Sequence, residues 1–278
     1  MRLGGSIAQT FESPQEWIKC HEQLGYRAAY CPVDTTADDA TVREFRTAAD
    51  RANLLIAEVG AWSNPIHPDS GKAQQAVQYC CERLALAERI GARCCVNITG
   101  SRSPDVWDGP HQNNFSEETF ALIVDSVRKI IDAVKPQRTR YVIETMPWAL
   151  PSSADEYVRL LEAVDRPALG VHLDPVNLVN SPRRAYSTSA IISDFFDKLG
   201  PRVVSAHAKD VNLVPELTVQ LVEVLPGEGL LDYSTFLHEL SQLDNDTPLL
   251  IEHLHGPDEY LKAANYIRRI AHQNSIAL

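Results

Sequence analysis

The sequence has no long apolar run. Although 44% of its residues are hydrophobic, no stretch approaches the roughly 20 apolar residues that a helix needs to cross a bilayer. Residues 1–7 lack the apolar core of a secretory signal and have instead the pattern of a strand. We therefore expect no membrane partner and a cytoplasmic location.

Positive charge is also scarce. The chain carries 26 Lys and Arg against 37 Asp and Glu, which gives a net charge of −11. Proteins that bind nucleic acids gather Lys and Arg on one face to neutralise phosphates. The charge balance therefore argues against a nucleic-acid partner and favours a small-molecule substrate.

Common redox and nucleotide-binding motifs are missing. The six cysteines include two adjacent pairs but no C-x-x-C, so neither a zinc-finger spacing nor a disulfide framework is present. We expect reduced thiols packed in the core. Neither G-x-G-x-x-G nor a P-loop occurs.

The sequence does have a regular alternation of strand-like and helical runs, eight of each. The strand-like runs cover residues 2–7, 27–33, 54–62, 93–99, 140–146, 168–174, 203–210 and 248–254. Their near-continuous Val, Ile and Leu content is typical of parallel strands covered by helices. Eight such units predict an α/β fold, a (β/α)8 TIM barrel, with residues 1–278 as one domain. The alternative is a doubly wound open sheet, which would spread the strand ends along a line.

Four of these strands end in residues that can bind metal ions: Glu144, Asp174, His207 and Glu252. Sites in TIM barrels lie at the carboxyl ends of the strands, so we expect these side chains to meet at one rim. Three carboxylates and one imidazole suit Mn²⁺, Mg²⁺ or Co²⁺ better than metals that prefer thiolates. In the alternative interpretation they form rim salt bridges with basic residues such as Lys209.

Other polar residues near the strand ends are candidates for contact with a substrate. Lys209 shares a face with His207, which predicts a contact with the substrate or with a carboxylate. His172 lies one layer below Asp174 and is either a hydrogen-bonded interior residue or a substrate contact. Glu58 ends the third strand and is a candidate for hydroxyl recognition.

The loops supply three more candidates. Residues 100–115 and 175–189 are long connections, which we expect to cover the substrate. Trp107 lies in the first of them. His67 stands in the aromatic and polar stretch 62–68 after the third strand, which either suits a sugar or forms a plain surface loop. Arg183 in the second either binds an anionic group or lies in solvent. In a third insertion, residues 218–224 alternate between polar and apolar side chains, which predicts a short extra strand.

The chain resembles the xylose isomerase-like superfamily of sugar phosphate isomerases and epimerases along essentially its whole length. The resemblance is carried by the order Glu144, Leu173-Asp174, His207-Ala208-Lys209-Asp210, Pro226-Gly227-Glu228-Gly229 and Glu252-His253. It implies a divalent metal, Mn²⁺ foremost, held by the four residues at the strand ends. It also implies that Glu144 and Glu252 are acid/base partners on opposite sides of the substrate.

Two branches of that superfamily differ from this chain. The ketose 3-epimerase branch has a His three residues after the metal-binding Asp, where this chain has Asn177, a further candidate for substrate contact. The DNA-repair endonucleases use a histidine-rich trinuclear zinc site and a basic groove, which a net charge of −11 does not favour.

The resemblance thus implies a metal-dependent sugar or polyol isomerase or epimerase that moves a proton next to a carbonyl through an enediolate. The first alternative is a lyase on the same site, either a keto-sugar or keto-inositol dehydratase or a C-glycoside deglycosidase acting on a 3-keto sugar. The second is a sugar-binding protein without turnover. We expect a homodimer or homotetramer.

Overall fold

Eight parallel strands close into a barrel in the computed structural model, which describes residues 1–278. The barrel strands are β1 (Arg2–Gly5), β2 (Ala28–Tyr30), β3 (Leu55–Gly60), β4 (Cys94–Asn97), β5 (Arg140–Glu144), β6 (Leu169–Leu173), β7 (Val203–Ala208) and β10 (Pro248–Ile251). Their order around the ring is β1, β10, β7, β6, β5, β4, β3 and β2. The (β/α)8 TIM barrel is confirmed. Each strand begins within one residue of its expected start and ends one to three residues before its expected end.

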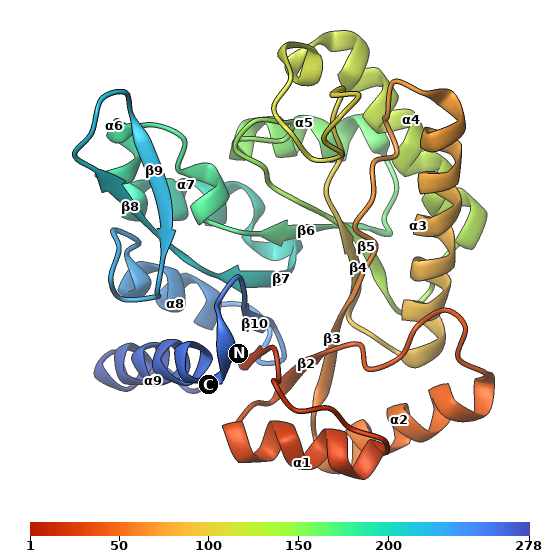
Figure 1. Ribbon diagram of the computed structural model, residues 1–278, viewed down its shortest axis with the longest axis vertical. Helices are drawn as coiled ribbons and strands as arrows, with labels where there is room; N and C mark the ends of the chain where they lie inside the picture. Colours follow the sequence, from red (N-terminus) through yellow and green to blue (C-terminus); the bar gives the residue numbers. More distant parts are fainter.

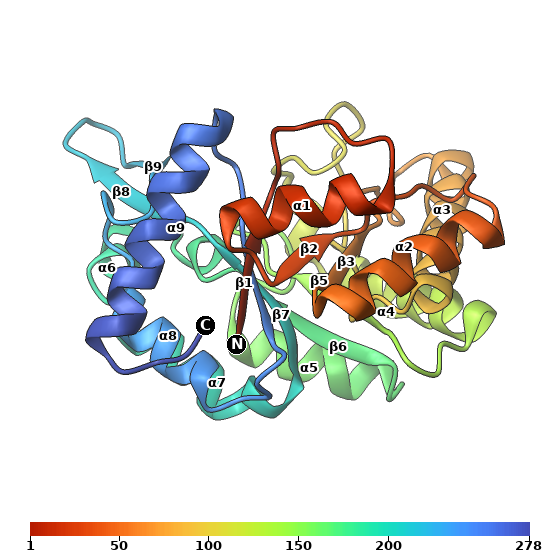
Figure 2. The same ribbon diagram turned by 90° about the horizontal axis from the view of Figure 1, so that it is seen from below.

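Helices surround the barrel on its outside, as Figures 1 and 2 show. They are α1 (Pro14–Leu24), α2 (Asp39–Ala52), α3 (Ser70–Ile90), α4 (Glu117–Val134), α5 (Ala154–Val164), α6 (Pro182–Ala185), α7 (Thr188–Leu199), α8 (Tyr233–Ser241) and α9 (Gly256–Gln273), with short 3₁₀ turns η1 (Gln112–Phe115), η2 (Val176–Leu178) and η3 (Gly200–Arg202). The hydroxyl of Ser13 accepts a hydrogen bond from the Glu16 amide and so starts α1, and Gly25 ends it with a φ of 63°. None of the helices is both long and apolar enough to span a membrane.

The two faces of the strands have different environments. On β6, Val171 and Leu173 point outward and belong to the large apolar core between the strands and the helices. His172 and Asp174 alternate with them and are fully buried on the inner side of the barrel. The polar residues therefore lie inside the barrel because the strand has a period of two.

Two strands depart from this simple alternation. In the pairing of β2 with β3, Ala29 lies opposite Ile56 but Tyr30 lies opposite Glu58, so β3 contains one extra residue. The pairing of β6 with β7 shifts in the same way just before Ser205. A bulge of this kind changes the direction of the side chains beside it. Both irregularities lie at the level of the polar interior.

A hairpin projects from the carboxyl end of the barrel, at the left of Figure 1. It consists of β8 (Asp210–Val214) and β9 (Gln220–Val224), paired antiparallel, which confirms the extra strand expected in this insertion. The Asp210 carboxylate accepts hydrogen bonds from the backbone amides of Gly227, Gly229 and Leu231 and so fixes the chain as it returns to the barrel. A Cβ atom at Gly229 would lie 2.2 Å from the Asp210 Oδ1 atom, so this position requires glycine.

Candidate metal centre

Four side chains from four strand ends converge at the carboxyl end of the barrel: Glu144, Asp174, His207 and Glu252. One oxygen or nitrogen atom of each lies within 4.8 Å of one atom of every other. The Nδ1 atom of His207 is 2.8 Å from the Oε1 atom of Glu252 and 3.4 Å from the Oε1 atom of Glu144. The structure thus brings together the four residues that the sequence predicts as ligands.

A lysine ammonium lies within this group. The Nζ atom of Lys209 is 2.7 Å from the Oδ2 atom of Asp174 and 2.6 Å from the Oε1 atom of Glu252. Burial disfavours the charged form, but the carboxylates of Asp174 and Glu252 outweigh this effect and raise the pKa of Lys209 above its usual range. Lys209 therefore stays charged and partly neutralises the three carboxylates.

The acidic groups at the centre differ in their proton affinity. Burial raises the pKa of Asp174 to about 6, although the Lys209 ammonium acts in the opposite sense. For Glu144 and Glu252, the nearby His207 outweighs the effect of burial and holds the pKa of each carboxyl below its usual range. The two glutamates are therefore ionised at neutral pH, whereas Asp174 binds a proton more readily.

The donor atoms fit a divalent cation. The Oδ2 atom of Asp174, the Nδ1 atom of His207 and the Oε1 atom of Glu252 are buried, yet none of them has a partner in hydrogen-bond geometry. Their close neighbours, at 2.6 to 2.8 Å, are the charged groups of the ion pairs described above. Buried polar atoms are normally satisfied, and three oxygen ligands with one imidazole suit Mn²⁺, Mg²⁺ or Co²⁺.

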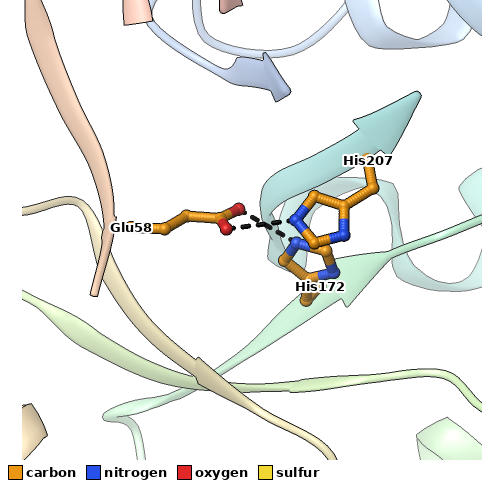
Figure 3. Close-up of side chains that lie close together, drawn as sticks. All are labelled: Glu58, His172 and His207. Carbon is orange, nitrogen blue, oxygen red and sulfur yellow. Dashed lines mark hydrogen bonds and ion pairs between the residues drawn. The ribbon is translucent and has the colours of Figure 1, made fainter. Parts of the chain in front are cut away.

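A second buried polar cluster supports His207 from below. The Nε2 atom of His207 is 3.1 Å from the Oε2 atom of Glu58, and the Nε2 atom of His172 is 3.0 Å from its Oε1 atom (Figure 3). The hydroxyl of Ser205 donates a hydrogen bond to the same Oε1 atom. Burial opposes the ionisation of Glu58, but the two histidines outweigh it and hold the pKa of this carboxyl below its usual range.

A cavity of about 700 Å³ opens above the four candidate ligands. Its polar wall includes Glu144, Lys209, Glu252 and Asn177, whose side-chain amide donates a hydrogen bond of 3.1 Å to the Oε1 atom of Glu144. The aromatic residues in its wall are Tyr30, Trp62, Trp107, Trp148 and Tyr260. The cavity therefore combines charged groups at its base with flat apolar surfaces.

The structure places the predicted substrate contacts in different regions. Trp107, Asn177 and Lys209 line the cavity. His172 does not, because it is fully buried and its Nε2 atom is bonded to Glu58. Of the two interpretations given for His172, the geometry therefore matches the interior residue.

Two of the candidates taken from loops lie elsewhere. His67 lies in a separate cleft that is also lined by residues of α3 and α4, where its Nδ1 atom accepts a hydrogen bond from the amide of Asp69. Arg183 is exposed on α6 and is absent from the cavity wall. Neither residue lines the cavity above the metal centre. The sequence could not show this, because loop residues have no periodicity from which the direction of a side chain can be inferred.

Sequence reasoning missed other residues of the site. It assigned Glu58 to hydroxyl recognition, whereas the side chain bonds to His207 beneath the cavity. It gave no role to Glu223, which reaches the cavity from β9 and lies 3.0 Å from His253. It named no individual role for Trp62 or Trp148. Trp62 ends the third strand-like run, residues 54–62, and begins the aromatic and polar stretch that follows, which was the signal available for it.

Comparisons with known proteins agree with the barrel fold. A family model described as "Xylose isomerase-like TIM barrel" matches residues 21–270. No curated protein matches the chain significantly in sequence. Similar solved structures include a xylose isomerase-like TIM barrel protein from Mycobacterium smegmatis in complex with magnesium, with 18% identity, 95% and 90% of the two chains covered and a TM-score of 0.67.

Two further structures carry names of enzymes. D-psicose 3-epimerase, solved in the presence of D-fructose, is 14% identical, with 99% of each chain covered and a TM-score of 0.72. The probable 3-DHS dehydratase AsbF from Bacillus anthracis is 16% identical, with 95% of each chain covered and a TM-score of 0.69. At these identities the structures establish the fold alone, whereas the family model covers most of the chain. The chain therefore belongs to the xylose isomerase-like TIM barrel family.

Proposed function

We propose that this protein is a divalent-metal-dependent sugar or polyol isomerase or epimerase. The observation that carries the proposal is the pair Glu144 and Glu252, which come from strand ends three places apart in the ring and flank the Nδ1 atom of His207. Both carboxylates also line the cavity. Two ionised carboxylates on different sides of a bound substrate are suited to removing a proton from one carbon and returning it from either face.

Glu144, Asp174, His207 and Glu252 would hold the metal, for which Mn²⁺ fits best and Mg²⁺ or Co²⁺ also fit. When bound, such an ion polarises a carbonyl oxygen and so makes the adjacent C–H bond more acidic. The remaining steps belong to the side chains. Asn177 donates a hydrogen bond to Glu144, and Lys209 lies against Glu252, so each glutamate has a neighbour that orients it.

The proton transfer follows from these positions. One glutamate removes the proton next to the carbonyl, and an enediolate forms as electrons move onto the oxygens. If the same glutamate returns the proton to the neighbouring carbon, and a proton passes from one enediolate oxygen to the other, the product is an isomer. If the other glutamate, carrying a proton taken up from water, donates that proton to the opposite face of the same carbon, the product is an epimer, and the first glutamate then releases its proton to water. Because His207 holds the pKa of each carboxyl below its usual range, both glutamates are ionised at neutral pH and each has a free oxygen lone pair to accept a proton.

The aromatic wall favours a second candidate function, a lyase on the same site. Three of the four tryptophans in the chain, Trp62, Trp107 and Trp148, line the cavity. Sites of about 300–1,000 Å³ hold molecules of drug size, so a cavity of about 700 Å³ has room for more than one ring. A keto sugar with an attached ring fits this shape. After proton removal, the electrons left on the carbon next to the carbonyl would expel the substituent on the following carbon and form a double bond.

Nuclear magnetic resonance in D₂O distinguishes the candidates. The protein is loaded with Mn²⁺, incubated with keto sugars, keto-inositols or 3-keto C-glycosides, and removed together with the metal before spectra are recorded. Deuterium in the recovered sugar together with a new isomer supports the isomerase or epimerase. Loss of water or release of an aglycone supports the lyase. Binding without exchange or turnover in any substrate overturns both and leaves a sugar-binding protein.

A further inference from the structure

The bulges in β3 and β7 turn the side chains of Glu58 and Ser205 toward the inside of the barrel, although strict alternation would turn them outward. In β3, Ala57 packs with the small apolar cluster inside the barrel, and Val59 belongs to the outer core. The residue between them would alternate outward after Ala57, but the extra residue lets Glu58 point inward as well. In β7, Val204 packs inside with β4 and β5, and the shift lets Ser205 follow it inward.

These two re-aimed residues meet each other. The hydroxyl of Ser205 donates to the Oε1 atom of Glu58, which also accepts from the Nε2 atom of His172. The Oε2 atom of Glu58 lies 3.1 Å from the Nε2 atom of His207. Glu58 and both histidines are fully buried. Two separate departures from strand geometry thus serve a single cluster, with the imidazole of His207 at its upper side (Figure 3).

We propose that Glu58 is a positioning residue that keeps the proton of His207 on Nε2 and so reserves Nδ1 for the metal. An ionised carboxylate only accepts hydrogen bonds, so the imidazole nitrogen that faces it must carry hydrogen. The other nitrogen, Nδ1, faces Glu144, Asp174 and Glu252, and it is the one that gives up its proton when a metal ion binds among them. Carboxylates that bond the outer nitrogen of a metal-binding histidine fix its tautomer and ring orientation in this way.

The same residues could be thought to form a second metal site, because single atoms of Glu58, His172 and His207 lie within 4.8 Å of one another. Their contacts favour the positioning role instead. Both oxygens of Glu58 are already engaged at 3.0 to 3.1 Å by imidazole nitrogens, and Ser205 adds a third donor. This inference rests on one part of the proposed function, the binding of a metal ion by the four candidate ligands at the strand ends.

Replacing Glu58 by Gln tests the proposal. The amide has the same shape but presents one donor group in place of an acceptor. Its oxygen keeps the position of Oε1, where Ser205 and His172 both donate, so its NH2 group faces His207, which must then turn a lone pair toward it and carry its proton on Nδ1. We expect Mn²⁺ affinity, measured by paramagnetic resonance of the free ion, to fall about 10- to 100-fold. Ser205→Ala removes one donor and should lower the affinity less.

A matched control separates positioning from general stability. Glu88 on α3 also accepts several hydrogen bonds, from the backbone amides of Gln137, Arg138 and Thr139, but lies outside the metal centre and its cavity. Glu88→Gln should lower the melting temperature without changing the Mn²⁺ affinity. In protein loaded with Mg²⁺ and labelled with ¹⁵N-histidine, the parent should show His207 protonated on Nε2, and Glu58→Gln should lose this signature.

The outcomes are distinct. If the parent binds Mn²⁺ and Glu58→Gln binds it within twofold, or if His207 keeps its tautomer, the positioning role is overturned and the proposed function stands. If Glu58→Gln does not fold, Ser205→Ala takes its place in the test. The positioning role of Glu58 is then overturned if Ser205→Ala binds Mn²⁺ as tightly as the parent and its His207 signature is unchanged. Binding of two ions per parent chain, with one lost in Glu58→Gln, replaces it by a second metal site. A parent that binds no divalent ion overturns both proposals.

Discussion

The dependence of Mn²⁺ affinity on pH tests the electrostatics of the centre, because protons and metal ions compete for the same donor atoms. Burial alone would lower the pKa of His207, but Glu252, Glu58 and Glu144 outweigh it and raise the pKa well above its usual range. The metal-free protein therefore carries a proton on the Nδ1 atom of His207 at neutral pH. This proton must leave when the metal binds, so the affinity should fall as the pH falls.

The magnitude follows from the number of protons displaced. Each proton that must leave reduces the affinity about tenfold per pH unit, which is about 1.4 kcal/mol. Between pH 6.5 and 7.5 only His207 is titrated against the metal, so we expect about a tenfold change. Asp174, with a pKa of about 6, binds a second proton at lower pH. Below pH 6 the slope should therefore approach about a hundredfold per unit.

Two measurements check this prediction. Paramagnetic resonance of free Mn²⁺ gives the affinity at each pH, and calorimetry in two buffers with different protonation enthalpies counts the protons released. His67→Gln is a suitable control because His67 lies in a separate cleft, and it should show the slope of the parent. An affinity that changes less than twofold from pH 7.5 to 5.5, with no proton released at pH 7, would refute the charge assignment for His207.

Three further predictions concern catalysis, the hairpin and assembly. Glu144→Gln and Glu252→Gln should each reduce turnover by about 10²- to 10⁴-fold at saturating Mn²⁺, and recovery of near-parental rates once the variants are fully metallated would remove their acid/base role. Gly229→Ala places a Cβ atom 2.2 Å from the Asp210 carboxylate, so the melting temperature should fall in calorimetry, whereas an unchanged melting temperature contradicts the packing described for this turn. Light scattering should give about twice or four times the mass of one chain at micromolar concentration, and the mass of a single chain would rule out the expected homo-oligomer.

The barrel and the candidate ligands could be predicted from sequence because both follow from simple periodicity. Strands with a period of two, repeated eight times, fix which side chains meet at the carboxyl rim, and this placed Asp174 and His207 correctly beside each other. The role of Glu58 could not be predicted in the same way. A bulge changes the side of the sheet to which a side chain points, and no sequence pattern indicates where a bulge occurs in this strand. The positions of His67 and Arg183 were unpredictable for a different reason, since loops have no repeating geometry.

The anchoring of the β8–β9 hairpin has a consequence for how this protein can change during evolution. Asp210 fixes the base of the hairpin through backbone amides of the returning chain, whereas Leu217 at its tip is fully exposed. Insertions or deletions near the tip can therefore alter the wall that carries Glu223 while the four candidate ligands keep their places. A lineage can therefore remodel this wall of the cavity and keep the four candidate ligands unchanged.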